Sequence, residues 1–272
     1  MDVTPRYLGG DSFLGRRDPR VLLLVPLLYL VAVAGVGDLR GVAFCALFAF
    51  VYYRAAGIPW REVRKNWIFV LGFTAILVVV NSILTDALTV TARSPELFTV
   101  PLTGSVVSMA TLSYSLTIFI RYVTLAMVGF PVAFAVAPND MGVAFARLGV
   151  PQRLAYAVDL TFRFIPSVAA SVRETIDAQR IRGFEHKRKG NPLVRLKSLK
   201  PVVIPVTVNA LVEAEDTANA MDLRGFGGGR RTWLRELSFG PADYLVVAGF
   251  LLLAAGMTAA EVLGFSEEVW IP

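Results

Sequence analysis

The stretch "NWIFVLGFTAILVVVNSILT", residues 66–85, decides the fold class because it runs for 20 residues without a charge, between Lys65 and Asp86. An α-helix rises about 1.5 Å per residue, so about 20 apolar residues cross the roughly 30 Å of hydrocarbon in a bilayer. Two further uncharged runs of 17 residues lie at 21–37 and 244–260. These three runs predict helices that span a membrane.

Composition agrees with a membrane location. The chain has 272 residues, 55% of them hydrophobic, a mean hydropathy of +0.59 and a net charge of +6, whereas soluble domains contain about 45–50% apolar residues. Cys45 is the one cysteine and His186 the one histidine. A disulfide framework and a Cys/His metal cluster are therefore excluded, and we expect no metal, cofactor or catalytic residue in this chain.

We predict an all-α membrane protein of about five transmembrane helices, at 21–37, 40–56, 66–86, 105–137 and 241–264. The fourth is ambiguous, because Arg121 interrupts it and a split there would give six. Five spans place 24 of the 27 Lys and Arg residues on one side, as the excess of basic residues in cytoplasmic loops requires.

The same charge argument orients the chain. The N-terminal segment 1–20 is expected in the cytoplasm, and the tail 265–272 outside it. The segment 138–240 carries amphipathic patterns and is expected to form a cytoplasmic helical domain inserted before the last span. Arg121 then lies in or near the fourth span, where a charge costs about 2.5–3.5 kcal/mol. It either makes a packing or gating contact or lies at the outer interface, and the hydroxyl-rich stretch 111–117 favours the interface.

Two segments of the cytoplasmic domain end alike. "DAQRIRGF" (177–184) and "NAMDLRGF" (219–226) are identical at four of eight positions and carry an aliphatic residue at a fifth. The matched pairs are Ala178 with Ala220, Ile181 with Leu223, Arg182 with Arg224, Gly183 with Gly225, and Phe184 with Phe226.

Helix capping is the simpler explanation of these ends, because glycine tolerates the left-handed conformation that closes a helix and arginine complements the helix dipole. The alternative is that each end presents an arginine to a groove of another protein, where the guanidinium binds carboxylates or carbonyls. The repetition favours the second explanation and a partner with two equivalent grooves.

Three other features bear on function. The small-residue stripe Ala210, Ala214, Ala218 and Met221 is spaced for close packing against another helix. The basic run 185–200 favours anionic lipid headgroups over nucleic acid. The glycine-rich stretch "GFGGGRRT" (225–232) lacks the Gly-Lys-Ser/Thr ending of a P-loop, so we expect no ATP binding.

Over nearly its whole length the chain resembles the transmembrane T component of energy-coupling factor (ECF) transporters, which are ABC-type importers. The similarity lies in "FLGRRDPRVLLL" (13–24), in 145–184, which ends on Arg182-Gly183, and in 201–232, which contains Arg224-Gly225. The signature of that family is a pair of Ala-Arg-Gly tripeptides. This chain departs from it at the first position of each, where Ile181 and Leu223 replace alanine.

The resemblance implies a non-catalytic coupling subunit in a prokaryotic plasma membrane. Its partners would be two ABC ATPases, which bind the ATP and magnesium, and a substrate-binding S component for a vitamin or a transition-metal ion such as cobalt. Arg182 and Arg224 would anchor the helix ends in the ATPases, and Phe184 and Phe226 would wedge the joints. The S component, rather than this chain, would select the substrate.

Two alternatives remain, a membrane enzyme and an adaptor with a basic cytoplasmic domain. The enzyme would need convergent acid, base or metal-binding residues near the interface, which the sequence does not offer. The adaptor would bind nucleic acid in a salt-sensitive way through the 185–200 run.

Overall fold

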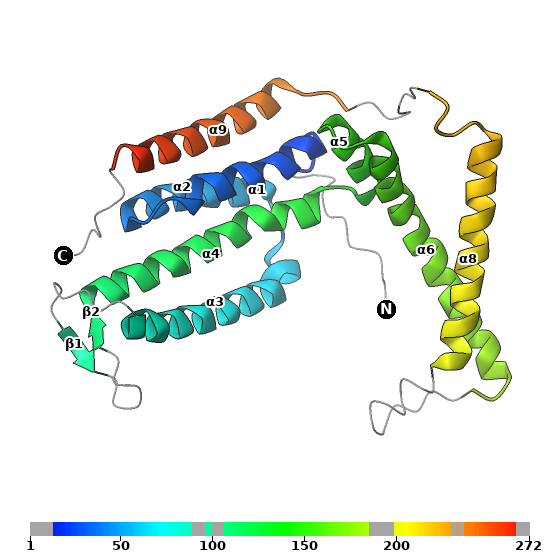
Figure 1. Ribbon diagram of the computed structural model, residues 1–272, viewed down its shortest axis with the longest axis horizontal. Coiled ribbons are helices and arrows are strands. Elements are labelled where there is room, and N and C mark those ends of the chain that lie inside the picture. Colours follow the sequence, from blue (N-terminus) through cyan, green and yellow to red (C-terminus); the bar gives the residue numbers. More distant parts are fainter. Residues whose placement is uncertain are drawn as a thin grey trace. The chain divides into compact units, whose positions relative to one another are not determined.

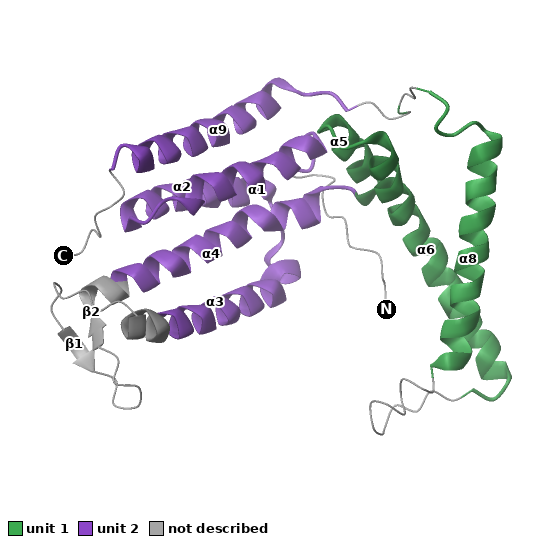
Figure 2. Ribbon diagram, viewed as in Figure 1, with its two compact units in different colours: residues 1–6, 138–236 green, residues 7–137, 237–272 purple. Residues whose placement is uncertain are grey.

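The computed structural model describes residues 13–88, 96–99, 106–184, 199–229, 233 and 237–264. The described chain forms two compact units (Figures 1 and 2). We call the described residues of 138–236 the helical unit, and those of 7–137 and 237–272 the membrane unit.

The membrane unit contains five long helices, and four of them are long and apolar enough to cross a bilayer. The helices are α1 (Pro19–Ala34), α2 (Leu39–Ala56), α3 (Trp60–Leu88), α4 (Met109–Ala135) and α9 (Pro241–Val262). The spanning segments are Leu39–Ala56, Trp60–Asn81, Ser113–Ala135 and Pro241–Val262, while Pro19–Ala34 is a shorter apolar helix. The prediction of an all-α membrane protein is confirmed.

The fourth span begins later than the sequence predicted. Residues 106–108 do not belong to a helix, because β2 (Val106–Ser108) pairs antiparallel with β1 (Glu96–Thr99) in a small hairpin. Helix α4 starts at Met109 rather than at 105 and continues through Arg121 to Ala135. A single helix over this region agrees with five apolar helices and not with a split at Arg121.

Helix α1 lies at the centre of the membrane unit. It packs against α4 and α9, and α4 also packs against α2 and α3. Val21, Val25 and Tyr29 of α1 are completely buried. The ring of Phe250 in α9 meets Tyr29 and Tyr52 edge-on, at centroid distances of 6.3 and 5.4 Å. These edge-to-face contacts join α1, α2 and α9 into one core.

The sequence Asp18-Pro19-Arg20 fixes the start of α1. The Asp18 carboxylate accepts the Arg20 amide at 2.9 Å as an N-cap, and Pro19 suits the first turn because its missing N–H has no partner there. The Arg20 guanidinium forms an ion pair with the Asp18 carboxylate at 2.6 Å and donates to the carbonyl of Leu237 at 3.0 Å. One tripeptide therefore caps α1 and holds the segment that leads into α9.

Arg121 has a defined partner within the membrane unit. Its guanidinium donates to the backbone carbonyl of Val36, just beyond the end of α1 at Ala34. Carbonyls at a helix C-terminus carry partial negative charge and no intrahelical partner. Arg121 thus makes a packing contact at the end of a neighbouring helix, which was one of the two expectations for it.

A polar contact links α2 to α3. The indole N–H of Trp67 donates to the Tyr53 hydroxyl at 3.0 Å, and the two rings meet edge-on. Trp67 also packs against Phe130 of α4 with ring centroids 5.1 Å apart. Trp67 therefore holds α3 to both of its neighbours.

The helical unit contains η1 (Pro138–Asp140), α5 (Met141–Arg147), α6 (Gln152–Ile181) and α8 (Lys200–Leu223). Gly142 allows α5 to lie close to α6. A Cβ atom at this position would lie 2.6 Å from Cβ of Asp159 and 2.9 Å from the carbonyl oxygen of Ala155. Such distances are too short for any side chain, so the α5–α6 packing requires glycine here.

Candidate functional site

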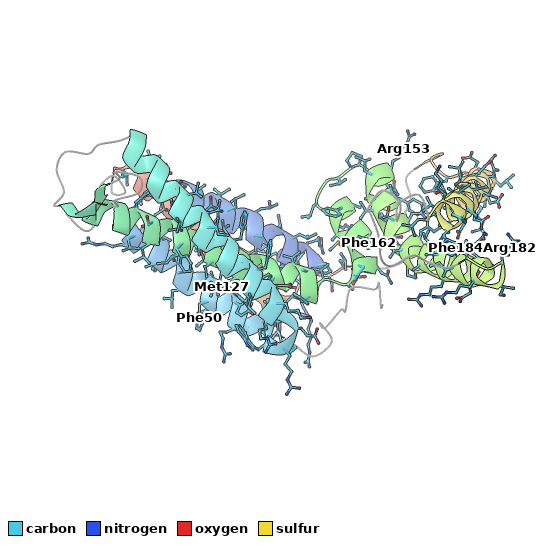
Figure 3. All side chains as sticks on the ribbon, turned by 90° about the horizontal axis from the view of Figure 1, so that it is seen from below. Phe50, Met127, Arg153, Phe162, Arg182 and Phe184 are labelled. Carbon is cyan, nitrogen blue, oxygen red and sulfur yellow. The ribbon has the colours of Figure 1, made fainter. Side chains whose placement is uncertain are left out.

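The end of α6 closes in a Schellman motif. The amide of Phe184 donates to the carbonyl of Gln179 at 2.9 Å, and the amide of Gly183 donates to that of Arg180 at 3.0 Å. Gly183 has φ +82°, in the left-handed region where a Cβ atom is unfavourable. Arg182 and Phe184 lie together at this end (Figure 3).

The end of α8 repeats this geometry. The amide of Phe226 donates to the carbonyl of Met221 at 2.9 Å, and the amide of Gly225 to that of Asp222 at 2.9 Å. Gly225 has φ +66°. The arginines before the two glycines also match, with φ and ψ of −83° and 12° at residue 182 and of −88° and 7° at residue 224. The two matching octapeptides therefore have the same local structure.

Capping explains the backbone of each end but not the side chains that it presents. Ile181 is 89% exposed and Leu223 is 90% exposed. Arg182 and Arg224 follow them and are exposed as well. An aliphatic side chain contributes nothing to a helix cap when it points into solvent. Each end thus presents an apolar side chain next to a cation, in the same conformation.

The remaining matched residues differ in burial. Ala178, Ala220, Gly183 and Gly225 are exposed, whereas Phe184 and Phe226 are half-buried. The ring of Phe226 lies 4.6 Å from the ring of Tyr156 near the start of α6. Phe226 therefore packs against its own chain, and no local sequence pattern had singled out Tyr156 as its partner.

Helices α6 and α8 are antiparallel, so the two ends point in opposite directions (Figure 1). Tyr156 meets Phe226, and Ser167 donates to the Glu213 carboxylate at 2.8 Å. Residue numbers rise along α6 as they fall along α8, which places Arg224 level with Ala157. At 1.5 Å per residue, the α6 end lies about 38 Å farther along the helix pair.

The small-residue stripe of α8 is divided between two environments. Ala210 and Met221 are half-buried, and Val206 and Thr217 are half-buried with them, on the face that carries Glu213. Ala214 and Ala218 are exposed. This arrangement leaves two alanines of the stripe on the outer surface of the helical unit, where another helix can approach closely.

Several sequence features fall outside the described residues. These are the N-terminal residues 1–12, most of the basic run 185–200 with His186, residues 230–232 of the glycine-rich stretch, and the tail 265–272. Within the described ranges there is no group of three or more His, Cys, Asp and Glu side chains placed to hold a metal ion.

Five apolar helices, joined to a helical unit in which α6 and α8 have matched exposed ends, define an integral membrane protein. Comparison with known protein families identifies a family that matches most of the chain. Residues 10–233 match the family described as CbiQ, cobalt transport protein. The chain therefore belongs to this family, which contains the transmembrane T components of energy-coupling factor transporters.

Curated relatives agree over nearly full length. The chain is 29% identical over 265 residues to the energy-coupling factor transporter transmembrane protein EcfT of Bacillus selenitireducens, covering 96% of this chain and 98% of the relative. It is 30% identical to the EcfT of Acidaminococcus fermentans, over 93% and 96% of the two chains. The EcfT of Leuconostoc gelidum subsp. gasicomitatum is 27% identical, over 91% and 94%.

Proposed function

We propose that this chain is the non-catalytic coupling subunit of an ECF-type importer. In this role the ends of α6 and α8 dock into two ABC ATPase subunits, which bind ATP and magnesium. The observation that carries the proposal is the pair of exposed aliphatic residues, Ile181 and Leu223, on helix ends with the same pattern of backbone hydrogen bonds. Two equal ends suit two equal grooves, which an ATPase dimer would offer.

Each part of an end has a distinct task in this proposal. Ile181 and Leu223 fill an apolar groove, because nearly all of their surface is available for burial. Arg182 and Arg224 bind carboxylates or carbonyls at the groove edge. The glycines turn the chain away from the partner, and Phe226 fixes one end against Tyr156.

Motion would pass through the contact between α6 and α8. When the ATPases close on ATP, the two grooves change their separation, and the antiparallel helices must slide or pivot against each other. A side-chain hydrogen bond between Ser167 and Glu213 crosses this interface and is exposed to solvent. An exposed hydrogen bond can exchange with water, so breaking it on pivoting would cost little free energy.

The pivoting would be passed to a membrane-embedded S component that binds a vitamin or a transition-metal ion. The exposed alanines Ala214 and Ala218 are the part of the stripe suited to that contact, since small side chains permit close helix approach. The chain would lie in a prokaryotic plasma membrane, with its N-terminus and the helical unit in the cytoplasm. The excess of basic residues on that side supports this orientation.

The test is co-purification of the chain with its ATPases. Replacing both Arg182 and Arg224 with alanine should reduce the retained ATPase. A charge-assisted hydrogen bond is worth about 1.5–3 kcal/mol, so each end should bind about 10- to 150-fold more weakly. The matched control is Arg180→Ala. Arg180 is exposed and lies two residues before Arg182, and its ion pair is with Asp177 of the same helix.

Loss of ATPase in the double variant, with retention in the control, supports docking through the two ends. Full ATPase retention and full uptake by the double variant would show that the two ends serve only as helix caps.

A further inference from the structure

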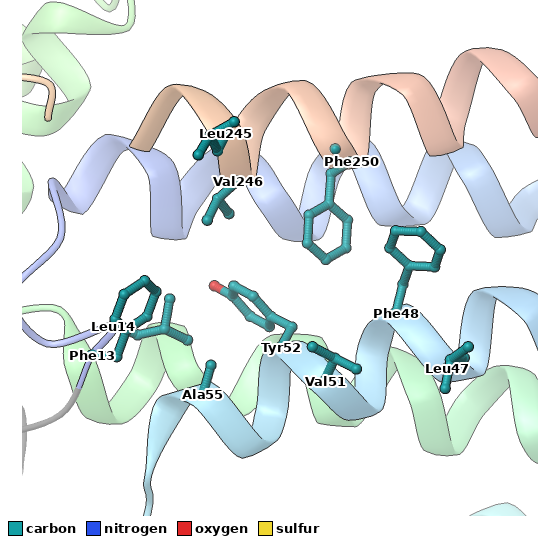
Figure 4. Close-up of a pocket in the computed structure, with 11 residues that line it drawn as sticks. Phe13, Leu14, Leu47, Phe48, Val51, Tyr52, Ala55, Leu245, Val246 and Phe250 are labelled. Carbon is teal, nitrogen blue, oxygen red and sulfur yellow. The ribbon is translucent and has the colours of Figure 1, made fainter. Parts of the chain in front are cut away.

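A cleft in the membrane unit lies between α2 and α9, beside the residues that precede α1 (Figure 4). Its volume is about 380 Å³, within the range of small-molecule sites. Leu14, Tyr52 and Phe250 form a buried floor, while Leu47, Val51 and Leu245 form an exposed rim. The wall of the cleft is therefore almost entirely apolar, and the cleft is open on the outer surface of the helix bundle.

One polar group is directed into this apolar space. Tyr52 is only 5% exposed, and its hydroxyl points into the cleft between Leu14 and Val246 (Figure 4). The hydroxyl is buried without a hydrogen-bond partner among the described residues. A buried hydroxyl without a partner costs free energy, and in native proteins such groups are nearly always satisfied. The Tyr52 hydroxyl therefore marks where a ligand presents a hydrogen-bond acceptor.

The depth of this hydroxyl matches one part of a phospholipid. Tyr52 lies four residues before the end of α2 at Ala56, which is about 6 Å along the helix. Val246 lies about as far inside the start of α9 at Pro241. Helix α2 has 18 residues and is about 27 Å long, close to the roughly 30 Å of hydrocarbon, so its end lies near the boundary with the interfacial region, within reach of the Tyr52 side chain. Glycerol ester carbonyls lie at this level and accept hydrogen bonds.

Two arginines and one carboxylate lie at the mouth of the cleft, which leaves it with a net positive charge. The guanidinium carbon of Arg17 lies 4.1 Å from the ring centroid of Phe13, which lines the cleft. The Nε of Arg17 forms an ion pair with the Asp243 carboxylate at 3.9 Å, which is too long for a hydrogen bond, and this Nε has no hydrogen-bond partner among the described residues. That carboxylate already accepts the amide of Gly240 at 2.8 Å. Arg16 is exposed beside them.

We propose that this cleft is a binding site for an anionic phospholipid. The Tyr52 hydroxyl donates to an ester carbonyl, one acyl chain lies along the apolar wall towards Leu47 and Phe48, and the phosphate lies at Arg17. Basic pockets between membrane helices select anionic headgroups in this way. The proposal concerns the membrane unit alone and does not depend on docking to ATPases.

The experiment measures lipid retained by the full-length chain. The purified protein is mixed with equal amounts of phosphatidylglycerol and phosphatidylcholine in detergent and examined by native mass spectrometry. The wild-type chain should keep one phosphatidylglycerol, at about fivefold preference over phosphatidylcholine for one arginine. Equal retention of the two lipids would overturn the assignment of an anionic headgroup.

Gly249 provides a variant that fills the cleft. It lines the cleft in α9, and a Cβ atom there would meet nothing within 4 Å among the described residues. Gly249→Leu should therefore abolish specific retention without straining the helix. Gly256→Leu is the matched control, because Gly256 is equally open in α9 but does not line the cleft. Equal retention in the two variants would refute the site.

A second variant tests the hydroxyl. Tyr52→Phe keeps the ring and should lower phosphatidylglycerol retention about fivefold, the effect of one hydrogen bond. Tyr29→Phe is the control, since Tyr29 is as deeply buried and packs on the same Phe250 ring but does not line the cleft. Equal loss of lipid from the two variants would refute the role of the Tyr52 hydroxyl. A wild-type chain that keeps no lipid and pairs with a second copy through this face would refute the lipid site itself.

Failure here and failure of the coupling proposal can be told apart. Lipid retention is measured in the absence of ATPases, so its loss in the wild-type chain leaves docking through Ile181 and Leu223 untouched. A chain that keeps phosphatidylglycerol but binds no ATPase refutes only the coupling proposal.

Discussion

Truncation of the two exposed aliphatic residues is the sharpest test of docking. Ile181→Ala and Leu223→Ala together remove the apolar surface and leave the backbone of both ends unchanged. Fully burying such a side chain is worth about 1.5–3 kcal/mol. Both side chains are about nine-tenths exposed in the free chain, so nearly all of this free energy is available on docking.

We expect a loss of about 1.5–2 kcal/mol at each end, since alanine keeps one carbon of the side chain. The ends lie about 38 Å apart along the helix pair, and effects at such separation add. The double variant should therefore bind the ATPase dimer a few hundred-fold more weakly. Its thermal unfolding should be unchanged, because exposed substitutions alter stability by no more than about 0.5 kcal/mol.

The assay is surface plasmon resonance of the ATPase dimer over the chain in lipid nanodiscs. Val208→Ala with Leu211→Ala is the matched control, because both residues are exposed on α8 away from its end. Alanine also restores the Ala-Arg-Gly pattern of the family that the sequence resembles. Wild-type or tighter binding by the double variant would refute the reasoning, because the grooves would then accept alanine as well as a large aliphatic side chain.

Three further predictions concern stability, each measured as the thermal unfolding midpoint of the purified chain in detergent. Gly142→Ala should destabilise the helical unit by about 1–3 kcal/mol through overpacking, whereas Gly129→Ala, with open space around it among the described residues, should not; equal midpoints would contradict the close α5–α6 approach. Tyr53→Phe should cost about 1 kcal/mol by leaving the Trp67 indole without its acceptor, and an unchanged midpoint would show that this contact contributes nothing. Asp18→Ala should cost about 1 kcal/mol or more by removing the α1 N-cap, which a wild-type midpoint would exclude.

The membrane helices could be predicted from the sequence because an uncharged run of 17–20 residues leaves few alternatives to a buried or spanning helix. The start of the fourth helix could not. Residues 106–108 are as compatible with a strand as with a helix, and pairing between β1 and β2 decides the matter. Local pattern does not contain that information, since the partner strand lies several residues upstream.

The contact of Arg121 also lay beyond the sequence. An arginine inside an apolar run must find a partner, and hydropathy shows the cost but not the partner. The carbonyl of Val36 is 85 residues away along the chain and is brought near by the packing of α1 against α4. Only the tertiary arrangement identifies it.

At the candidate site the sequence predicted the repetition but not its exposure. Spacing shows that Ile181 and Leu223 are equivalent, yet either could have packed inward against the other helix. The α8 stripe shows the same limit. Residues 210, 214, 218 and 221 share one broad face, but Val206, Thr217 and Glu213 define where α6 lies. The contact with α6 therefore divides the stripe.

The antiparallel pairing of α6 and α8 gives one asymmetric chain a local pseudo-twofold axis. Rotation by half a turn about that axis exchanges the two ends, which have the same pattern of backbone hydrogen bonds. On a partner with true twofold symmetry, the ends alone would then accept two orientations equally well. On a partner made of two different subunits, the orientation depends on the positions at which the two ends differ. Among these are Ile181 and Leu223, branched at Cβ and at Cγ, and the exposed Arg180 and Asp222, which carry opposite charges. These pairs would then decide which end meets which subunit.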